Sequence, residues 1–124
     1  MSNPTLLKSF TTGAAISPFR LVKLSAAETV IQSAATTDLF IGVSNEVGAA
    51  SGERQDVVLD GVAFVEAGAA FALGAYIGSD ASGRGITAAP AAGVNNRIIG
   101  LALEAASAAG DVVRVLVCPG SFQG

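Results

Sequence analysis

Apolar and β-branched residues gather into short runs along this chain, and each run is bounded by Gly, Asp, Asn, Ser or Pro. Runs of this kind at close spacing are typical of β-strands. No window sustains apolar residues at the 3.6-residue spacing of a helix. The pattern therefore predicts an all-β fold, either a small barrel or a compact sandwich of short strands. The predicted strands are Phe19–Leu24, Thr29–Gln32, Leu39–Ser44, Asp56–Leu59, Val62–Glu66, Ala75–Ser79, Arg97–Leu103 and Val112–Cys118.

Two turns and a loop separate these runs. Asp60 and Gly61 stand between two apolar runs, and Gly at the second position supplies the positive φ of a two-residue turn, so we predict a β-hairpin there. Residues 79–85 predict a wider turn in which Asp80 accepts hydrogen bonds from nearby amides. Residues 87–96 contain Pro90 and an Asn pair and predict a loop between strands.

The N-terminal segment, residues 1–18, differs from the rest, because a proline stands near each end and no partner strand is apparent within it. We expect an extended N-terminal arm over residues 1–18 that is not part of the core, followed by a single β domain over residues 19–124. The apolar residues of the arm have no core of their own. We therefore expect the arm to reach a neighbouring subunit, held partly by adding as a strand to an exposed sheet edge.

An internal repeat organises the β domain. Residues 41–59 align without gaps onto residues 99–117, and both copies consist of a strand, a turn of small residues, a glycine followed by an acid, and a strand. Identical residues at matched positions include Ile41 and Ile99, and Gly42 and Gly100. We therefore predict two pseudo-repeated hairpins, which would suit a small closed barrel or a compact sandwich.

The charge of the chain excludes several classes of partner. Ten acidic and seven basic residues give a net charge of -3, and the sequence pI is about 4.7. The basic residues never cluster into a stripe that would neutralise phosphates, so we expect no nucleic-acid partner. The longest uncharged run, residues 67–79, is short and broken by glycines, so we expect no membrane span. The N-terminus carries no apolar signal core, and we expect no export signal.

The chain offers little catalytic chemistry. It contains no histidine, so a Ser-His-Asp or Cys-His arrangement is impossible. The single cysteine, Cys118, lies in an apolar run and is interpreted as a small buried side chain. We interpret the acids Glu53, Asp56 and Asp60 as solvated turn charges, because their spacing does not match a calcium loop. Segments 42–46 and 78–85 resemble a nucleophile elbow and a phosphate loop but lack their essential residues, so we expect no catalytic, cofactor or metal site.

Taken in order and spacing, several segments resemble the small head decoration, or capsid cement, proteins of tailed bacteriophages. The resemblance covers residues 18–118, and its motifs consist mostly of glycines, alanines and valines. The chain departs from the family at Gly74-Ala75-Tyr76, where members often carry an acid after the glycine. The segments that carry the resemblance are 18–23 (PFRLVK), 41–44 (IGVS), 52–63, Gly74, 80–84 (DASGR), 99–104 (IGLALE) and 110–113 (GDVV).

The resemblance implies a non-enzymatic virion protein that binds the outer surface of a phage capsid and bridges neighbouring major capsid subunits, after synthesis in the host cytoplasm. It also implies a homo-oligomer, with a homotrimer favoured because threefold lattice positions suit a small cement subunit. The residues expected to contact the capsid or another subunit are Leu6, Leu7, Phe10, Ile16, Phe19 and Arg20.

A small-ligand-binding β-barrel and an enzyme are the two alternatives to capsid decoration. A small-ligand-binding β-barrel would line its cavity with aromatic residues and a few polar groups, whereas the aromatic residues here are few and scattered. An enzyme is the weakest alternative, because histidine and any cofactor fingerprint are missing. We further expect capsid binding to be mainly apolar and only modestly sensitive to salt.

Overall fold

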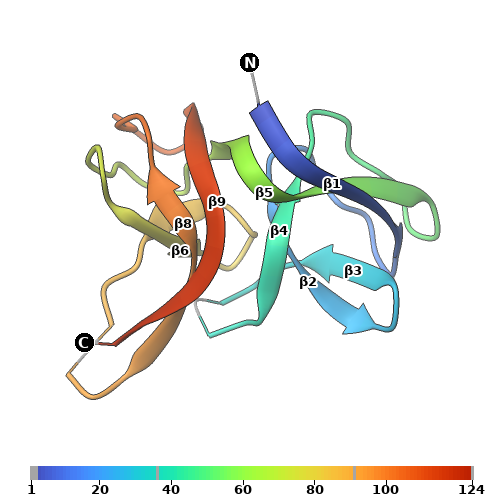
Figure 1. The fold of residues 1–124 in the computed structure, drawn as a ribbon, viewed down its shortest axis with the longest axis horizontal. Helices are drawn as coiled ribbons and strands as arrows, with labels where there is room; N and C mark the ends of the chain where they lie inside the picture. The colour runs from blue at the N-terminus through green and yellow to red at the C-terminus, as the bar shows by residue number, and fades with distance from the viewer. Residues whose placement is uncertain (1–2, 36, 91, 124) are drawn as a thin grey trace.

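The computed structural model describes residues 3–35, 37–90 and 92–123, and within them the chain forms nine β-strands and no helix (Figure 1). The predicted all-β fold is therefore confirmed. The strands are β1 (Asn3–Thr12), β2 (Leu21–Ala26), β3 (Thr29–Gln32), β4 (Phe40–Ser44), β5 (Arg54–Glu66), β6 (Tyr76–Ser79), β7 (Gly85–Thr87), β8 (Asn95–Ala102) and β9 (Val112–Gln123).

The strands form one continuous sheet in the order β1-β3-β2-β4-β5-β9-β8-β6-β7. Because β1 also pairs with β5, the first five strands close into a small barrel. From β5 the sheet continues through β9, β8, β6 and β7, which lie beside the barrel in Figure 1. This second part curls back on itself, and Ala67, just beyond β5, forms an isolated parallel bridge with Gly85 of β7.

The predicted hairpin at Asp60 and Gly61 is wrong. β5 runs unbroken through this point, so the two strands predicted on either side of it are parts of one strand. Gly61 does adopt a positive φ, 100°, but there it lets the strand change partners without reversing. The residues before it pair with β1 and β4, and the residues after it pair with β9, with an overlap at Val62, which also pairs with Asn3 of β1. Each run thus satisfies its backbone hydrogen bonds with separate strands, so the two runs do not pair with each other.

The other turn predictions fare better. The carboxylate of Asp80 accepts hydrogen bonds from the amides of Ser82 (2.8 Å) and Arg84 (2.9 Å), so the predicted turn between β6 and β7 is confirmed. The predicted loop over residues 87–96 is confirmed only in its middle, because β7 ends at Thr87 and β8 begins at Asn95.

The hairpins β4–β5 and β8–β9 have the same register. Val43 pairs with Val58 in the first hairpin, and Leu101 pairs with Leu116 in the second, which are the positions matched by the sequence repeat. The repetition extends to the preceding strands at a slightly smaller offset, so that β1, β2 and β3 correspond to the end of β5, β6 and β7. The corresponding pairs are Leu7–Val58 and Val62–Leu116, Val22–Gly42 and Ile77–Gly100, and Lys23–Ile31 and Gly78–Ile86.

The described chain is thus built from two similar units that share β5. We call residues 3–60 the first half and residues 61–123 the second half. The bridge of Ala67 with Gly85 corresponds to the parallel pair of Thr12 with Val30, which helps to close the first barrel. The offset between matched residues grows between β7 and β8, although the loops 33–39 and 88–94 are equally long, because β8 is extended at its start relative to β4.

Buried apolar side chains form two clusters. The smaller fills the barrel of the first half and contains Phe10, Ile16, Val22, Val30 and Val57. The larger fills the second half and also includes four residues of the first half, which we call the covered face: Leu21, Phe40, Val43 and Val58. The covered face is buried because β4 lies against β8 and β9. Both interiors are therefore filled with side chains, unlike the barrel of a ligand-binding protein.

The expectation that residues 1–18 stand apart from the core is wrong for those that the structure describes. β1 is extended, as expected, but it pairs with β5 and β3 of its own chain. Two of its predicted contact residues are buried in the barrel, Phe10 at 4% exposure and Ile16, just beyond β1, at 3%. The sheet edge that β1 joins is therefore one within this chain. The pairing was missed because β5 is distant from β1 in sequence.

Candidate functional site

Side-chain chemistry does not single out a catalytic centre. In the described part of the chain, no three acidic or cysteine residues lie close enough to hold a metal ion. No helix long and apolar enough to cross a membrane occurs there either. Cys118 is a free thiol that is exposed, contrary to the expectation that it is buried, because side chains alternate along β9 and Val117 takes the buried position. The candidate site therefore lies among surfaces suited to binding another protein.

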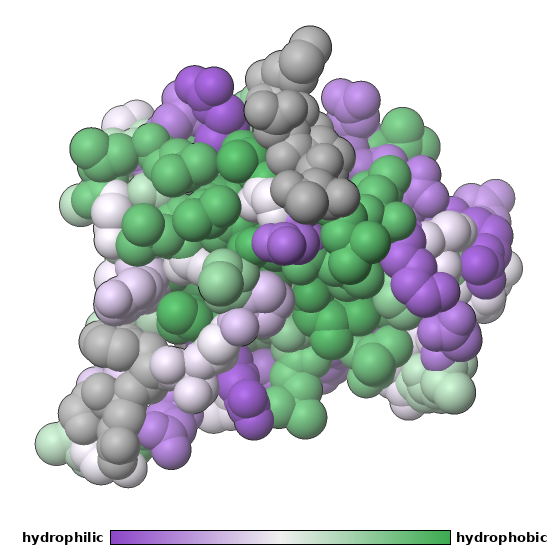
Figure 2. Space-filling model, viewed as in Figure 1, coloured by the Kyte–Doolittle hydropathy of each residue, from purple (hydrophilic) through white to green (hydrophobic). Residues whose placement is uncertain are grey.

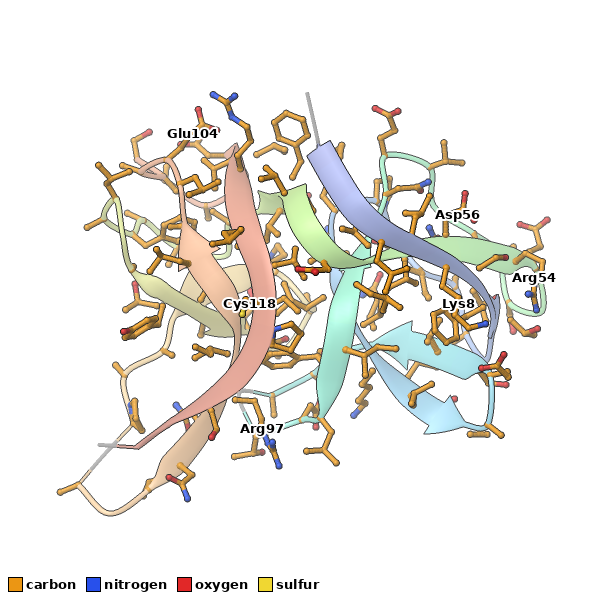
Figure 3. The ribbon with its side chains drawn as sticks, in the orientation of Figure 1. Lys8, Arg54, Asp56, Arg97, Glu104 and Cys118 are labelled. Atoms are coloured by element: carbon orange, nitrogen blue, oxygen red, sulfur yellow. The ribbon has the colours of Figure 1, made fainter. Side chains whose placement is uncertain are left out.

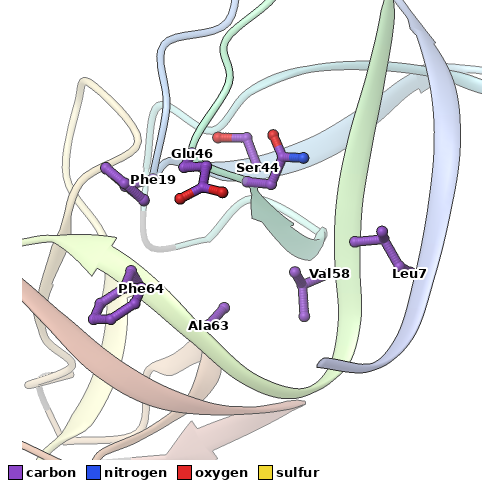
Figure 4. A pocket seen from close by; sticks show the side chains of 8 residues that line it. Leu7, Phe19, Ser44, Glu46, Val58, Ala63 and Phe64 are labelled. Carbon is purple, nitrogen blue, oxygen red and sulfur yellow. The ribbon is translucent and has the colours of Figure 1, made fainter. Parts of the chain in front are cut away.

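The clearest concave feature is a pocket at the seam between the two halves, with a volume of about 130 Å³ (Figure 4). We call it the seam pocket. β1 contributes one side, the end of β4 and the loop after it another, and the middle of β5 the floor. Its lining is mixed, with apolar side chains and a carboxylate. The lining residues are Leu7, Phe19, Ser44, Asn45, Glu46, Val58, Ala63 and Phe64.

Phe19 is held in the pocket by an unusual backbone conformation. Its φ is 62°, in the left-handed region that non-glycine residues rarely adopt. Its amide donates to the carbonyl of Asn45 (3.2 Å), and its carbonyl accepts from the amide of Glu66 (3.0 Å). The Phe19 ring packs edge-on against Phe64, with ring centroids 6.2 Å apart and an angle of 75° between planes. The two halves are thus joined through Phe19 beside the pocket.

Arg20 lies next to the pocket but is engaged within the chain. Its guanidinium donates to the carbonyl of Ser82 (2.9 Å) and to the carboxylate of Glu66 (3.3 Å). Glu66 also lies 3.9 Å from Arg84, which pairs with Asp80 at 3.1 Å. Only 16% of the Arg20 side chain is exposed. Its role in this structure is to connect the first half to the β6–β7 turn.

The six residues predicted as contacts therefore fall into three groups. Leu6 and Leu7 are about half exposed on β1, so an apolar contact through them stays a prediction. Phe10 and Ile16 are buried and do not reach the surface, so the structure offers no contact through them. Phe19 and Arg20 lie at the seam, where both contact the second half. Side chains alternate between the two faces of a strand, which places Leu7 outside and Phe10 inside.

Among the described residues, Glu46 lacks the arginine ion-pair partner that its counterpart Glu104 has. In the second half, the corresponding Glu104 accepts hydrogen bonds from the Arg114 side chain, which lower the pKa of Glu104. The residue that corresponds to Arg114 in the first half is Asp56. Glu46 is exposed, and no ion pair to it is found among the described residues. The pocket thus presents a negative charge next to apolar and aromatic side chains.

The sequence reasoning missed Glu46 and Phe64 as pocket residues. The predicted hairpin at Gly61 separated Phe64 from Leu7, whereas the continuous β5 brings both to the seam. A signal for Glu46 was present in the repeat, because Glu46 and Glu104 match while Asp56 stands where the second copy has Arg114. Figure 3 labels Asp56 beside the first half and Glu104 beside the second.

Figure 2 shows apolar residues gathered on the face that contains β1, β4 and β9 in Figure 1. One area lies over β4 and the neighbouring part of β1, and a second lies over the upper ends of β8 and β9. Large apolar side chains that are at least one third exposed include Leu6, Leu7, Leu24, Leu39, Leu103 and Leu116. Gathered apolar surface of this kind marks sites of protein association.

The chain is similar to one family of known proteins in sequence and to a solved structure in fold. The family model described as phage cement protein matches residues 3–117. A solved structure described as the head fiber gp8.5 N base of bacteriophage phi29 is similar in fold, with a TM-score of 0.69 and 15% sequence identity. That similarity covers 91% of this chain and 93% of the other. No curated protein sequence matches the chain.

Proposed function

This chain belongs to the phage cement protein family, and from that premise we propose that it decorates the outer surface of a phage capsid and stabilises the capsid by bridging neighbouring major capsid subunits. Proteins of this family are structural components of phage particles, so the proposal requires no enzymatic activity. The partner is the major capsid protein. The chain is made in the host cytoplasm and acts in the virion.

The observation that carries the proposal is the combination of the exposed Leu6 and Leu7 with the adjoining seam pocket. Both leucines lie on β1, whose pairing with β5 shifts register on either side of Leu6, so the two consecutive side chains are both exposed. Apolar groups presented on a rigid strand bind with little loss of conformational freedom. The cavity beside them is lined by aromatic residues and Glu46, which suits a protruding basic or apolar side chain of a capsid subunit.

A cement protein must resist the forces that separate capsid subunits. The two halves share one strand and one large core, so the described chain presents both halves as one packed unit. A contact through each half would therefore tie two capsid subunits together. We propose that the protein acts as a homo-oligomer, with a trimer favoured, because several subunits bound to one lattice raise avidity.

Co-sedimentation with purified capsids lacking this protein tests the proposal. The unmodified chain should sediment with the capsids and raise the temperature at which they release DNA. Leu6→Glu and Leu7→Glu should each weaken binding by about tenfold, because a charge replaces an apolar contact. Leu73→Glu is the matched control, since Leu73 is exposed on a loop of the second half. Absence of binding by the unmodified chain would overturn the proposed function.

A further inference from the structure

We propose that the outer face of the second half binds the first half of another copy of this chain, in a head-to-tail contact. The inference goes beyond capsid binding and does not depend on it. It follows from a difference in burial between surfaces that the internal repeat makes equivalent.

The covered face of the first half has an uncovered counterpart. Val58 is 2% exposed because the second half lies against it, whereas its counterpart Leu116 is 39% exposed. On the neighbouring strands, the buried Phe40 and Val43 have the half-buried counterparts Ile98 and Leu101. We call the second-half surface the open face. Its residues line a shallow apolar depression: Tyr76, Ile98, Gly100, Leu101, Leu116 and Cys118.

The surface that covers the first half consists of β8 and β9, which lie against β4, and of the β6–β7 turn, and this turn has an uncovered counterpart. In the chain, the β6–β7 turn docks on the first half, where the carbonyl of Gly83 accepts a hydrogen bond from the amide of Leu21 (2.8 Å). The corresponding β2–β3 turn, residues 25–29, is exposed at its tip. Gly83 is buried whereas its counterpart Glu28 is exposed. Leu24, at the base of this turn, is 48% exposed.

Each copy therefore has two exposed surfaces, the open face and the β2–β3 turn, whose counterparts contact each other within the chain. The occupant of the open face is the β2–β3 turn of a second copy, because within the chain the corresponding β6–β7 turn docks on the covered face at Leu21. A contact between different surfaces of identical chains is heterologous, and it closes into a ring or continues as a filament. The only acid in the turn, Glu28, already pairs with Lys8 at 3.0 Å, so its charge is offset on docking.

This contact differs in chemistry from the seam within the chain. The seam includes the ion pairs of Arg20 with Glu66 and of Arg84 with Asp80. At the corresponding positions the contact between copies has Ala75 in place of Arg20 and Thr29 in place of Arg84. The contact between copies is therefore mainly apolar, and its strength should change little with salt.

Sedimentation equilibrium of the purified chain without capsids, under reducing conditions, tests the proposal. The unmodified chain should form oligomers. Leu116→Glu on the open face should weaken association by at least about tenfold, as should Leu24→Glu at the β2–β3 turn. Val112→Glu is the matched control, because Val112 is 43% exposed on the same strand and its counterpart Arg54 is also exposed. All three variants replace exposed side chains, and thermal unfolding verifies that they fold.

A mixture of two variants gives the sharpest result. Leu116→Glu leaves the turn intact and Leu24→Glu leaves the open face intact, so an equimolar mixture should form heterodimers that neither variant forms alone. A monomeric unmodified chain at every accessible concentration would overturn the proposal, as would normal association of Leu116→Glu. Capsid binding is measured separately, so failure of this contact would remove the proposed homo-oligomer but leave the proposed decoration of the capsid standing.

Discussion

The turns that enter β2 and β6 have the same backbone conformation but different residues. Phe19 has a φ of 62° in the first half, and Gly74 has a φ of 83° at the corresponding position in the second. Glycine adopts this conformation without steric cost, whereas phenylalanine does not. Phe19 adopts this conformation despite the cost, and its ring lines the seam pocket and packs against Phe64. The shared backbone therefore sets the fold, and a residue held in a strained conformation, such as Phe19, marks a specialised surface.

In a second pair of matched turns, β2–β3 and β6–β7, it is the turn of the second half that contacts the other half. Glu28 and Gly83 have matching positive φ values of 56° and 77°. The glycine lies against the first half, and a Cβ there would approach the carbonyl oxygens of Leu21 and Ser33 to 3.1 and 3.2 Å. Glu28 lies on an exposed turn, where a side chain has room. The requirement for glycine therefore reflects what covers the turn as well as its backbone angle.

The largest expected loss of stability comes from substituting a pair of matched glycines, one in each half, where two strands approach closely. A Cβ on Gly100 would collide with the carbonyl of Leu116, and one on Gly42 would collide with the carbonyl of Val58. Gly100→Ala and Gly42→Ala should each lower the free energy of unfolding by about 3 kcal/mol. Urea denaturation measures this loss. Gly120→Ala is the control, because its added Cβ comes no closer than 3.8 Å to another atom and its φ lies outside the strained positive range, and an equal loss there would refute the packing argument.

Substitution of Gly61 should have the next largest effect, because this residue joins the two halves within β5. Valine at its φ of 100° is strained, and we expect Gly61→Val to cost about 1 to 3 kcal/mol of unfolding free energy. The change should also lower the cooperativity of thermal unfolding, since the halves share the strand. A thermal midpoint equal to that of the unmodified chain would contradict the assigned backbone geometry.

Exchanging the residues of the matched turns sharpens the comparison further. Gly83→Ala should cost about 1 to 2 kcal/mol, because its Cβ meets the first half at a strained φ. Glu28→Gly should change stability by less than about 1 kcal/mol, since the relief of backbone strain is offset by glycine's greater chain entropy. Chemical denaturation of both variants measures the asymmetry. Equal losses in the two would show that the turns have the same surroundings.

The smallest expected effect is a dependence on pH. Hydrogen bonds from the Ser107 side chain and amide lower the pKa of Asp111, which also accepts from Ala108. A lowered pKa stabilises the folded chain above the ordinary value of 3.8, and this contribution is lost as the pH falls through that range. Asp111→Asn should therefore reduce stability at pH 7 and have little effect near pH 2. Its counterpart Glu53 accepts a hydrogen bond from the Ala50 amide, without a hydroxyl donor like that of Ser107, so Glu53→Gln should change stability less.

The sequence supports the fold class and most of the strands, because short β-branched runs bounded by turn residues have few alternatives. The register shared by β4–β5 and β8–β9 follows the same spacing that relates the two sequence copies. The place of β1 was missed because its partner strand is distant in sequence, and local pattern contains no information on such pairing. The Asp60-Gly61 error has a related cause, since a positive φ in glycine serves a bent strand as well as a turn.

The candidate site was less accessible to sequence reasoning. Leu7 and Phe10 are both apolar and lie close together on β1, yet one is half exposed and the other is buried. Leu116 and Val58 are matched by the repeat and by residue type, and only packing of the halves distinguishes them. Burial at these positions depends on how one half covers the other. That arrangement follows from tertiary contacts, which a strand pattern does not specify.

Electron cryomicroscopy of capsids incubated with the purified chain tests the central claim most directly. We predict added density on the outer capsid surface that fits both halves, with Leu6, Leu7 and the seam pocket against capsid subunits. Capsids incubated with Leu7→Glu should show reduced occupancy, and those incubated with Leu73→Glu should not. Density that places β1 and the seam pocket away from the capsid would contradict the assigned site, and capsids without added density would contradict the function.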